Sequence, residues 1–153
     1  MNSKEFTEKY LLNEVKLIEA ANVRLHLLSA MVHGIETAGA LLDSLPFKAK
    51  GQGKKRFDLA LRKLFANNYS EVNTELDLYN FLRSHMAHSM LPGKQIILSE
   101  TKNSHLLLVD DQLQFHLPSL YNDYVLAIEK LKELIDDDQV KNKRIEFDNL
   151  HHL

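Results

Sequence analysis

An apolar stripe at helical spacing runs from Phe6 to Leu45 without a proline, and it constrains the fold more than any other feature. Its members recur at spacings of three, four or seven residues: Leu11, Val15, Ile18, Leu25, Leu28, Val32, Ile35 and Leu42. This spacing predicts either one long helix or two helices that meet near Asn13. Gly34 and Gly39 each lower helix propensity by about 1 kcal/mol relative to alanine, so we expect another backbone to approach closely at both.

Three further helices and a change of period follow. Residues 54–66 and 118–135 keep the helical spacing, as do residues 71 to about 89, with Ser70 as the expected N-cap. Before the last helix, turn residues separate three short apolar runs, 95–100, 105–110 and 112–117. We therefore expect a mainly α fold: a bundle of four to five helices with a small antiparallel β meander inserted before the last long helix.

Length and composition indicate one globular domain over residues 1–153, since 44% of the residues are hydrophobic and 26% are charged. From about residue 138 the chain is mixed in composition, and we expect a mobile tail, either a short helix or partly disordered. The net charge of −2 gives no overall attraction to nucleic acid or to an anionic membrane. The N-terminus is polar, and no apolar run reaches the roughly 18–20 residues that span a bilayer. We expect a cytoplasmic protein without a membrane partner.

Residues 79–98, YNFLRSHMAHSMLPGKQIIL, carry ionisable groups in a stretch that otherwise reads as a buried helix. Burying such groups without partners costs several kcal/mol, so Arg83, His85 and His88 need an explanation. His85 and His88 share a helix face. Arg83 and His88 lie about 140° apart around a helix, and they converge if both flank a groove or the seam of a dimer.

Arg83 followed by four residues and then His88, late in a helix, resembles the Arg-x(4–6)-His motif of the HEPN superfamily. The surrounding LYNFLRSHMAHSMLPGKQIIL is also similar to small bacterial HEPN-like proteins, as are MVHGIETAGALLD (31–43) and KKRFDLAL (54–61). Taken together, the resemblance covers residues 25–118. The chain departs from the pattern at Ser84, where active members commonly carry Asn, Asp or His.

The resemblance implies a homodimeric helical bundle that acts as a metal-independent endoribonuclease without a cofactor. Arg83 would bind the scissile phosphate, and His88 would be the general acid or base that takes the proton of a ribose 2′-hydroxyl. Ser84 and His85 complete the candidate catalytic set. The implied partners are RNA and an antitoxin-type protein.

A basic, glycine-containing segment follows the first predicted helices and supplies a local positive surface. Its members are the candidate RNA-binding and phosphate-binding residues Lys48, Lys50, Lys54, Lys55 and Arg56. The segment lacks both the Gly-Lys-Ser/Thr ending and the preceding strand of a P-loop, so it is not a nucleotide motif.

Two other interpretations of the polar cluster stay open. In the first, the i, i+3 pairs His33/Glu36 and His85/His88 on neighbouring helices supply four ligands to a metal ion. In the second, Arg83 pairs with Glu36 or Asp43 across a helix interface, and such a pair fixes which surfaces meet. The protein is then a non-enzymatic interaction or scaffold domain.

Overall fold

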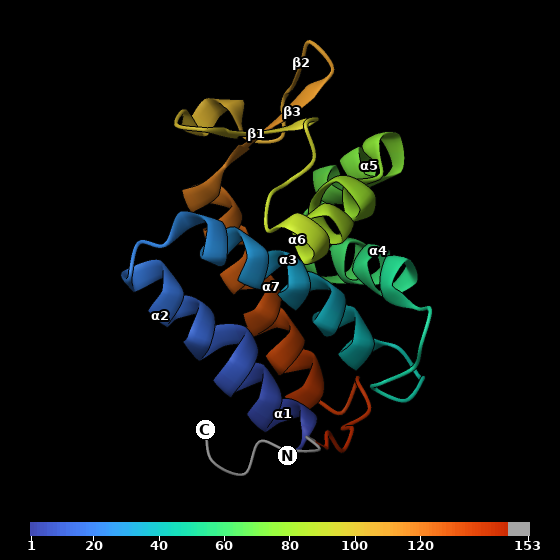
Figure 1. Ribbon diagram of the computed structural model, residues 1–153. Helices are drawn as coiled ribbons and strands as arrows, with labels where there is room; N and C mark the ends of the chain where they lie inside the picture. Colours follow the sequence, from blue (N-terminus) through green and yellow to red (C-terminus); the bar gives the residue numbers. More distant parts are fainter. Residues whose placement is uncertain (147–153) are drawn as a thin grey trace.

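The computed structural model describes residues 1–146, which form a mainly helical fold with a small sheet at one end (Figure 1). The first helical run consists of α1 (Ser3–Phe6), a π-helical segment (Thr7–Asn13) and α2 (Glu14–Ala20), and α3 (Arg24–Leu42) follows. The two helical runs meet at Asn22 rather than near Asn13. Asn22 has a φ of 54°, a left-handed conformation that asparagine tolerates better than most residues.

The middle of the chain is more divided than its apolar period predicts. α4 (Gly53–Leu64) agrees with expectation, but residues 71–89 are not one helix. α5 (Asn67–Leu76) ends where Asp77 adopts a φ of 53°, and a π-helical segment (Tyr79–Ser84) and α6 (His85–Ser89) follow. Ser70 is not the N-cap, because it lies inside α5, where its hydroxyl donates to the carbonyl of Asn67 at 2.8 Å.

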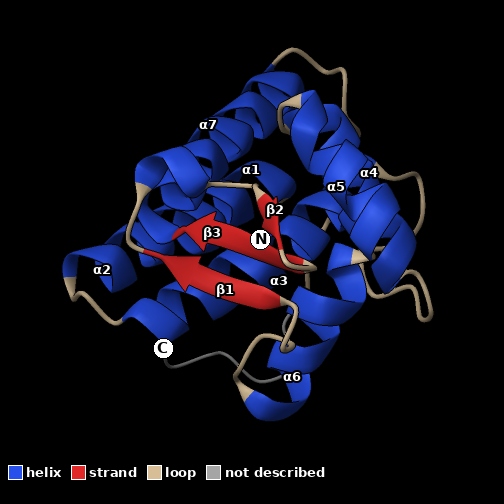
Figure 2. Cartoon of the chain, turned by 90° about the horizontal axis from the view of Figure 1, so that it is seen from above, coloured by secondary structure: helices blue, strands red, loops and turns tan. Residues whose placement is uncertain are grey.

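The sheet contains β1 (Ile96–Ser99), β2 (Leu108–Val109) and β3 (Gln112–His116), in the order β1-β3-β2 (Figure 2). β2 and β3 are antiparallel, but β1 runs parallel to β3, with Ile96 opposite Leu113. The predicted antiparallel meander is therefore wrong. A 3-10 turn (Lys102–Ser104) replaces the expected hairpin after β1, so the chain crosses over before β3 enters the middle of the sheet. β3 leads directly into α7 (Leu117–Asp136).

The core lies where α3, α4, α7 and the first helical run face one another (Figure 1). Its most deeply buried side chains include Leu28, Met31, Val32, Phe57, Leu61, Tyr124, Ile128 and Leu131. Among the described helices, α3 is the one long and apolar enough to cross a membrane by length and composition. In this fold 56% of that stretch is buried, as expected of a core helix.

The two glycines of α3 allow close contacts of different kinds. A β carbon at Gly39 would overlap the backbone carbonyl of Arg56 in α4, so the expected approach of a second backbone is confirmed there. At Gly34 the neighbour is instead the hydroxyl of Tyr124. This hydroxyl donates to the carbonyl of Leu11 at 2.9 Å and so links α7 to the first helical run.

A buried ionic cluster joins the end of α3, the start of α4 and the last described residues. Asp43 accepts a hydrogen bond from Arg56 Nε at 2.7 Å and another from Lys143 Nζ at 2.8 Å. Burial alone would raise the pKa of Asp43, but the two cations outweigh it and hold the pKa below its usual range. Lys143 and Ile145 are buried, so this part of the predicted tail is attached to the fold, although most residues between 139 and 146 are exposed. The rest of the predicted tail, 147–153, lies outside the described residues.

A second polar network attaches the sheet to the helices. The backbone N–H of His116 donates to His105 Nδ1 at 3.1 Å, so the ring proton of neutral His105 is on Nε2. Nε2 donates to the Tyr69 hydroxyl at 2.8 Å, and this hydroxyl donates to Asp123 at 2.7 Å. Burial raises the pKa of Tyr69 above its usual range, with Asp123 adding to the effect, so the phenol stays protonated. The network connects α5, the sheet and α7.

We predict that Gly39→Ala lowers the free energy of unfolding by about 1–3 kcal/mol, because the new methyl group forces α3 and α4 apart. Helix propensity alone predicts the opposite sign, since alanine is the better helix former by about 1 kcal/mol. Urea denaturation measures the difference. A variant more stable than the native protein would show that the two backbones have room to separate.

We predict that acid weakens the fold through His105. Burial lowers the pKa of His105 below its ordinary 6.5, with Asp123 opposing and His116 reinforcing the shift. As the pH falls, His105 therefore binds a proton at a higher pH in the unfolded chain than in the folded chain. Stability is complete above pH 6.5 and is lost as the pH falls through the folded pKa, by at most about 1.4 kcal/mol per pH unit.

Urea denaturation from pH 7.5 to pH 5 tests this contribution against two variants. His105→Gln should flatten the pH dependence, whereas His26→Gln, at an exposed position of α3, should leave it unchanged. An equal slope in the native protein and in His105→Gln would assign the acid sensitivity to other groups.

Candidate functional site

Arg83 lies at the junction of the π-helical segment with α3. Its Nε forms an ion pair with Glu36 Oε2, and the two side chains are 25% and 21% exposed. Both atoms are buried, and their alignment is that of a charge contact rather than a hydrogen bond. Of the two partners considered from the sequence, Glu36 is the one found, because Asp43 is held by Arg56 and Lys143.

Gly53, the first residue of α4, lets three elements meet at this pair. A β carbon at Gly53 would overlap the Tyr79 hydroxyl and would lie 3.1 Å from Glu36 Oε1. The Glu36 carboxylate and the Tyr79 hydroxyl therefore both rest against the start of α4. Because Tyr79 and Arg83 belong to the same π-helical segment, the ion pair lies where α3, α4 and that segment converge.

The outer part of the Arg83 side chain is open. Its buried Nε faces Glu36, and within residues 1–146 the two terminal nitrogens make no hydrogen bond. The side chain as a whole is 25% exposed, so part of it reaches solvent. A guanidinium fixed along one edge and open along the other can bind a second anion, such as a phosphate, in a defined orientation.

The other candidate catalytic residues are less confined. Ser84 is half-buried, whereas His85 and His88 are exposed on α6. The ring of His85 lies beside that of Phe81, with 6.4 Å between the ring centroids. In the described part of the chain no hydrogen bond or ion pair joins Arg83 to His88. One copy of the chain thus presents an oriented arginine and, on the next helix, an exposed histidine.

The four-ligand metal site considered from the sequence is not assembled. His33 turns its Nδ1 to the carbonyl of Ser29 on its own helix at 2.8 Å, and Glu36 is already neutralised by Arg83. His85 and His88 face solvent on α6. Within residues 1–146, no three or more His, Cys, Asp or Glu side chains are grouped to hold a metal ion.

The basic segment separates into exposed lysines and one buried arginine. Lys48, Lys50, Lys54 and Lys55 are exposed, and Lys54 binds Asp77 with 2.7 Å between Nζ and Oδ2. Arg56 was predicted to bind phosphate, but it is 6% exposed. Each of its three nitrogens donates to Asp43 or to the carbonyl of Pro46 or Phe47, so it holds the α3–α4 loop instead.

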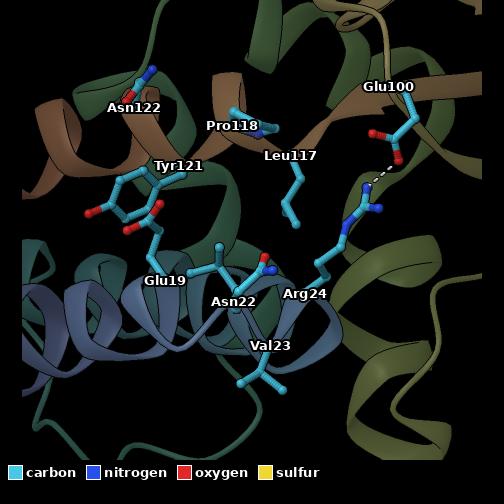
Figure 3. A pocket seen from close by; sticks show the side chains of 10 residues that line it. Glu19, Asn22, Val23, Arg24, Glu100, Leu117, Pro118, Tyr121 and Asn122 are labelled. Atoms are coloured by element: carbon cyan, nitrogen blue, oxygen red, sulfur yellow. Dashed lines mark ion pairs between the residues drawn. The ribbon is translucent and has the colours of Figure 1, made fainter.

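Sequence reasoning missed a cleft of about 450 Å³ that contains none of these residues. It lies between the α2–α3 junction, the residue after β1 and the start of α7. Figure 3 shows Arg24 reaching across to Glu100, with 2.7 Å between the charged atoms, and Glu19 beside Tyr121. Burial, and then the Glu19 carboxylate, raise the pKa of Tyr121. The lining comes from separated parts of the chain, so no local motif marks it.

The site with the most defined geometry is therefore the Arg83–Glu36 pair, with His88 on the following helix and exposed lysines at the start of α4. The Tyr69–His105–Asp123 network has more hydrogen bonds, but its hydroxyl and imidazole are largely enclosed and so have little access to a ligand. Comparisons of this chain with models of known families, with curated proteins and with solved structures find no match.

Proposed function

We propose that this protein is a HEPN-like endoribonuclease that acts as a homodimer and cleaves RNA without a metal ion. The observation that supports the proposal best is the state of Arg83. Glu36 holds the guanidinium through Nε, and the two terminal nitrogens, which make no hydrogen bond within residues 1–146, are available to a phosphate. An orienting carboxylate lowers the conformational freedom that the arginine would lose on binding RNA.

The proposed chemistry uses the RNA's own 2′-hydroxyl as the nucleophile. His88 takes the hydroxyl proton, and the oxygen attacks the adjacent phosphorus. Arg83 stabilises the charge that develops on the non-bridging oxygens. The bond to the 5′ oxygen breaks, this oxygen takes a proton from an acid in the site, and a 2′,3′-cyclic phosphate remains.

Two copies are part of the proposal because the resemblance to HEPN proteins implies a homodimer whose two Arg/His sets come together across a cleft. His88 is exposed, so it can approach the Arg83 of a second copy across a shared seam. The exposed Lys48, Lys50 and Lys55 add positive charge near the start of α4, and phosphate contacts of this kind weaken as salt rises.

We predict that the purified protein cuts single-stranded RNA in the presence of EDTA, and that Arg83→Ala and His88→Ala each slow cutting by at least about 100-fold. Gel analysis of end-labelled RNA measures the rate. Arg62→Ala and His26→Ala are matched controls at exposed positions, and each should cut like the native protein. Cutting that persists in both Arg83→Ala and His88→Ala would remove these residues from the mechanism.

A second candidate, a non-enzymatic interaction or scaffold domain, is favoured by the same ion pair. Arg83 and Glu36 join the π-helical segment to α3, which is a structural task that needs no RNA. Under this alternative the native protein neither cuts nor binds RNA, and Arg83→Ala weakens dimerisation. The RNA assay therefore separates the two candidates.

We predict that Arg83 and Glu36 are energetically coupled under either candidate. Arg83→Met and Glu36→Gln should each lower the free energy of unfolding by about 1–2 kcal/mol, because each leaves a half-buried charge without its partner. The double variant should lose less than the sum of the two. Urea denaturation of the four proteins measures the coupling, and additive losses would contradict it.

A further inference from the structure

Strand β1 is an edge strand with free backbone groups. β3 is its neighbour on one side, and the N–H of Leu113 donates to the carbonyl of Gln95 at 2.7 Å. In a parallel pair this contact determines which backbone groups point at the neighbouring strand. The backbone N–H and C=O of Ile97 point toward β3, whereas those of Ile96 and Leu98 point away from it. The N–H of Ile96 already donates to Gly93 at 2.9 Å. The Ile96 carbonyl and both backbone groups of Leu98 remain for another strand.

Two copies of the segment around β1 are complementary in charge when they run in opposite directions. Residues 94–100 read KQIILSE, with a cation at one end and an anion at the other. Antiparallel pairing of two copies centred on Ile97 sets Lys94 of each copy opposite Glu100 of the other. The same register places Ile96 opposite Leu98, which are the two residues whose backbone groups face outward. Charge and backbone direction thus select the same centre independently.

The side chains of β1 are accessible for this pairing. Ile97 is 38% exposed and would lie against its own copy at the centre. Lys94 is exposed and has no ion pair within residues 1–146. The Glu100 side chain binds Arg24 but is 80% exposed, so a second cation can reach it. β1 also lacks proline and charge within Ile96–Ser99, two features that commonly prevent edge strands from pairing.

We infer that β1 pairs in antiparallel register with β1 of a second copy, about a two-fold axis at Ile97, and that the two sheets become one. The inference rests on the proposed function for its purpose, since it names the surface of the proposed homodimer. Its evidence is separate, because it comes from the sheet and not from Arg83 or His88. α6 connects to β1 through residues 90–95, so the same pairing would bring the two α6 helices to one side of the joint sheet.

Sedimentation equilibrium of the full chain, without RNA, tests the register by exchange of charge. Lys94→Glu and Glu100→Lys should each raise the dimer dissociation constant by at least about tenfold, since each change places like charges opposite one another twice. The double variant Lys94→Glu/Glu100→Lys should return to within about threefold of the native value. Lys102→Glu, the same charge change just beyond β1, and Arg24→Gln, which removes the intrachain partner of Glu100, should leave dimerisation unchanged.

Ile97→Asp should abolish the dimer, and circular dichroism should show an unchanged fold because the position is exposed. A native chain that stays monomeric at about 100 μM would overturn the inference, as would a dimer unaffected by Lys94→Glu and Ile97→Asp. Failure of the charge exchange to restore dimerisation would overturn the register. A β1 dimer that does not cut RNA would support this inference and contradict the proposed function, and a dimer that cuts RNA but is unaffected by the β1 substitutions would do the reverse.

Discussion

The close approach of α3 and α4 at Gly39 is the contact on which the rest of the structure depends. With no β carbon at Gly39, the Arg56 backbone lies directly against α3, and this sets the distance between the two helices. Glu36 then faces Gly53 at the start of α4, and Asp43 reaches the Arg56 side chain. A wider separation would loosen both polar contacts, because hydrogen bonds and ion pairs lose strength within fractions of an ångström of misplacement.

Polar contacts in this fold specify where elements meet, while apolar burial supplies most of the stability. Burial is non-directional and contributes roughly 25 cal/mol for each Å² of apolar surface. It favours a compact bundle but not a particular one. The Asp43 cluster, the Arg83–Glu36 pair and the Tyr69–His105–Asp123 network each join segments far apart in the sequence. Such contacts add little net stability, yet they exclude arrangements in which a buried charge would lack a partner.

The helical period predicted most of the fold because it records which side chains are buried. The helical period directly predicts α3, α4 and α7. The close contact at Gly39 was expected from the presence of glycine within a helix. Breaks at Asn22 and Asp77 depend on single left-handed residues that leave the apolar period intact. The parallel pairing of β1 with β3 depends on a crossover whose path no local pattern reports.

The candidate site was predictable in part. The pairing of Arg83 with Glu36 was one of the alternatives, because an arginine on a core helix needs a carboxylate nearby. The assignment of Arg56 to the basic surface was wrong, since its neighbours in sequence are exposed lysines and only the fold turns it inward. The His105 network had no signal in the sequence, because its three members come from separate elements.

The position of Lys143 ties the two ends of the described chain into one cooperative unit. Its backbone N–H donates to the Ser3 hydroxyl at 2.8 Å, and the N–H of Ile145 donates to the carbonyl of Met1, also at 2.8 Å. Detaching this segment would strip Asp43 of one of its two cations while the carboxylate stays buried beside Arg56. In most proteins local unfolding begins independently at each end of the chain. Here it is coupled, because the amino-terminal turn loosens only together with the bridged segment around residue 144.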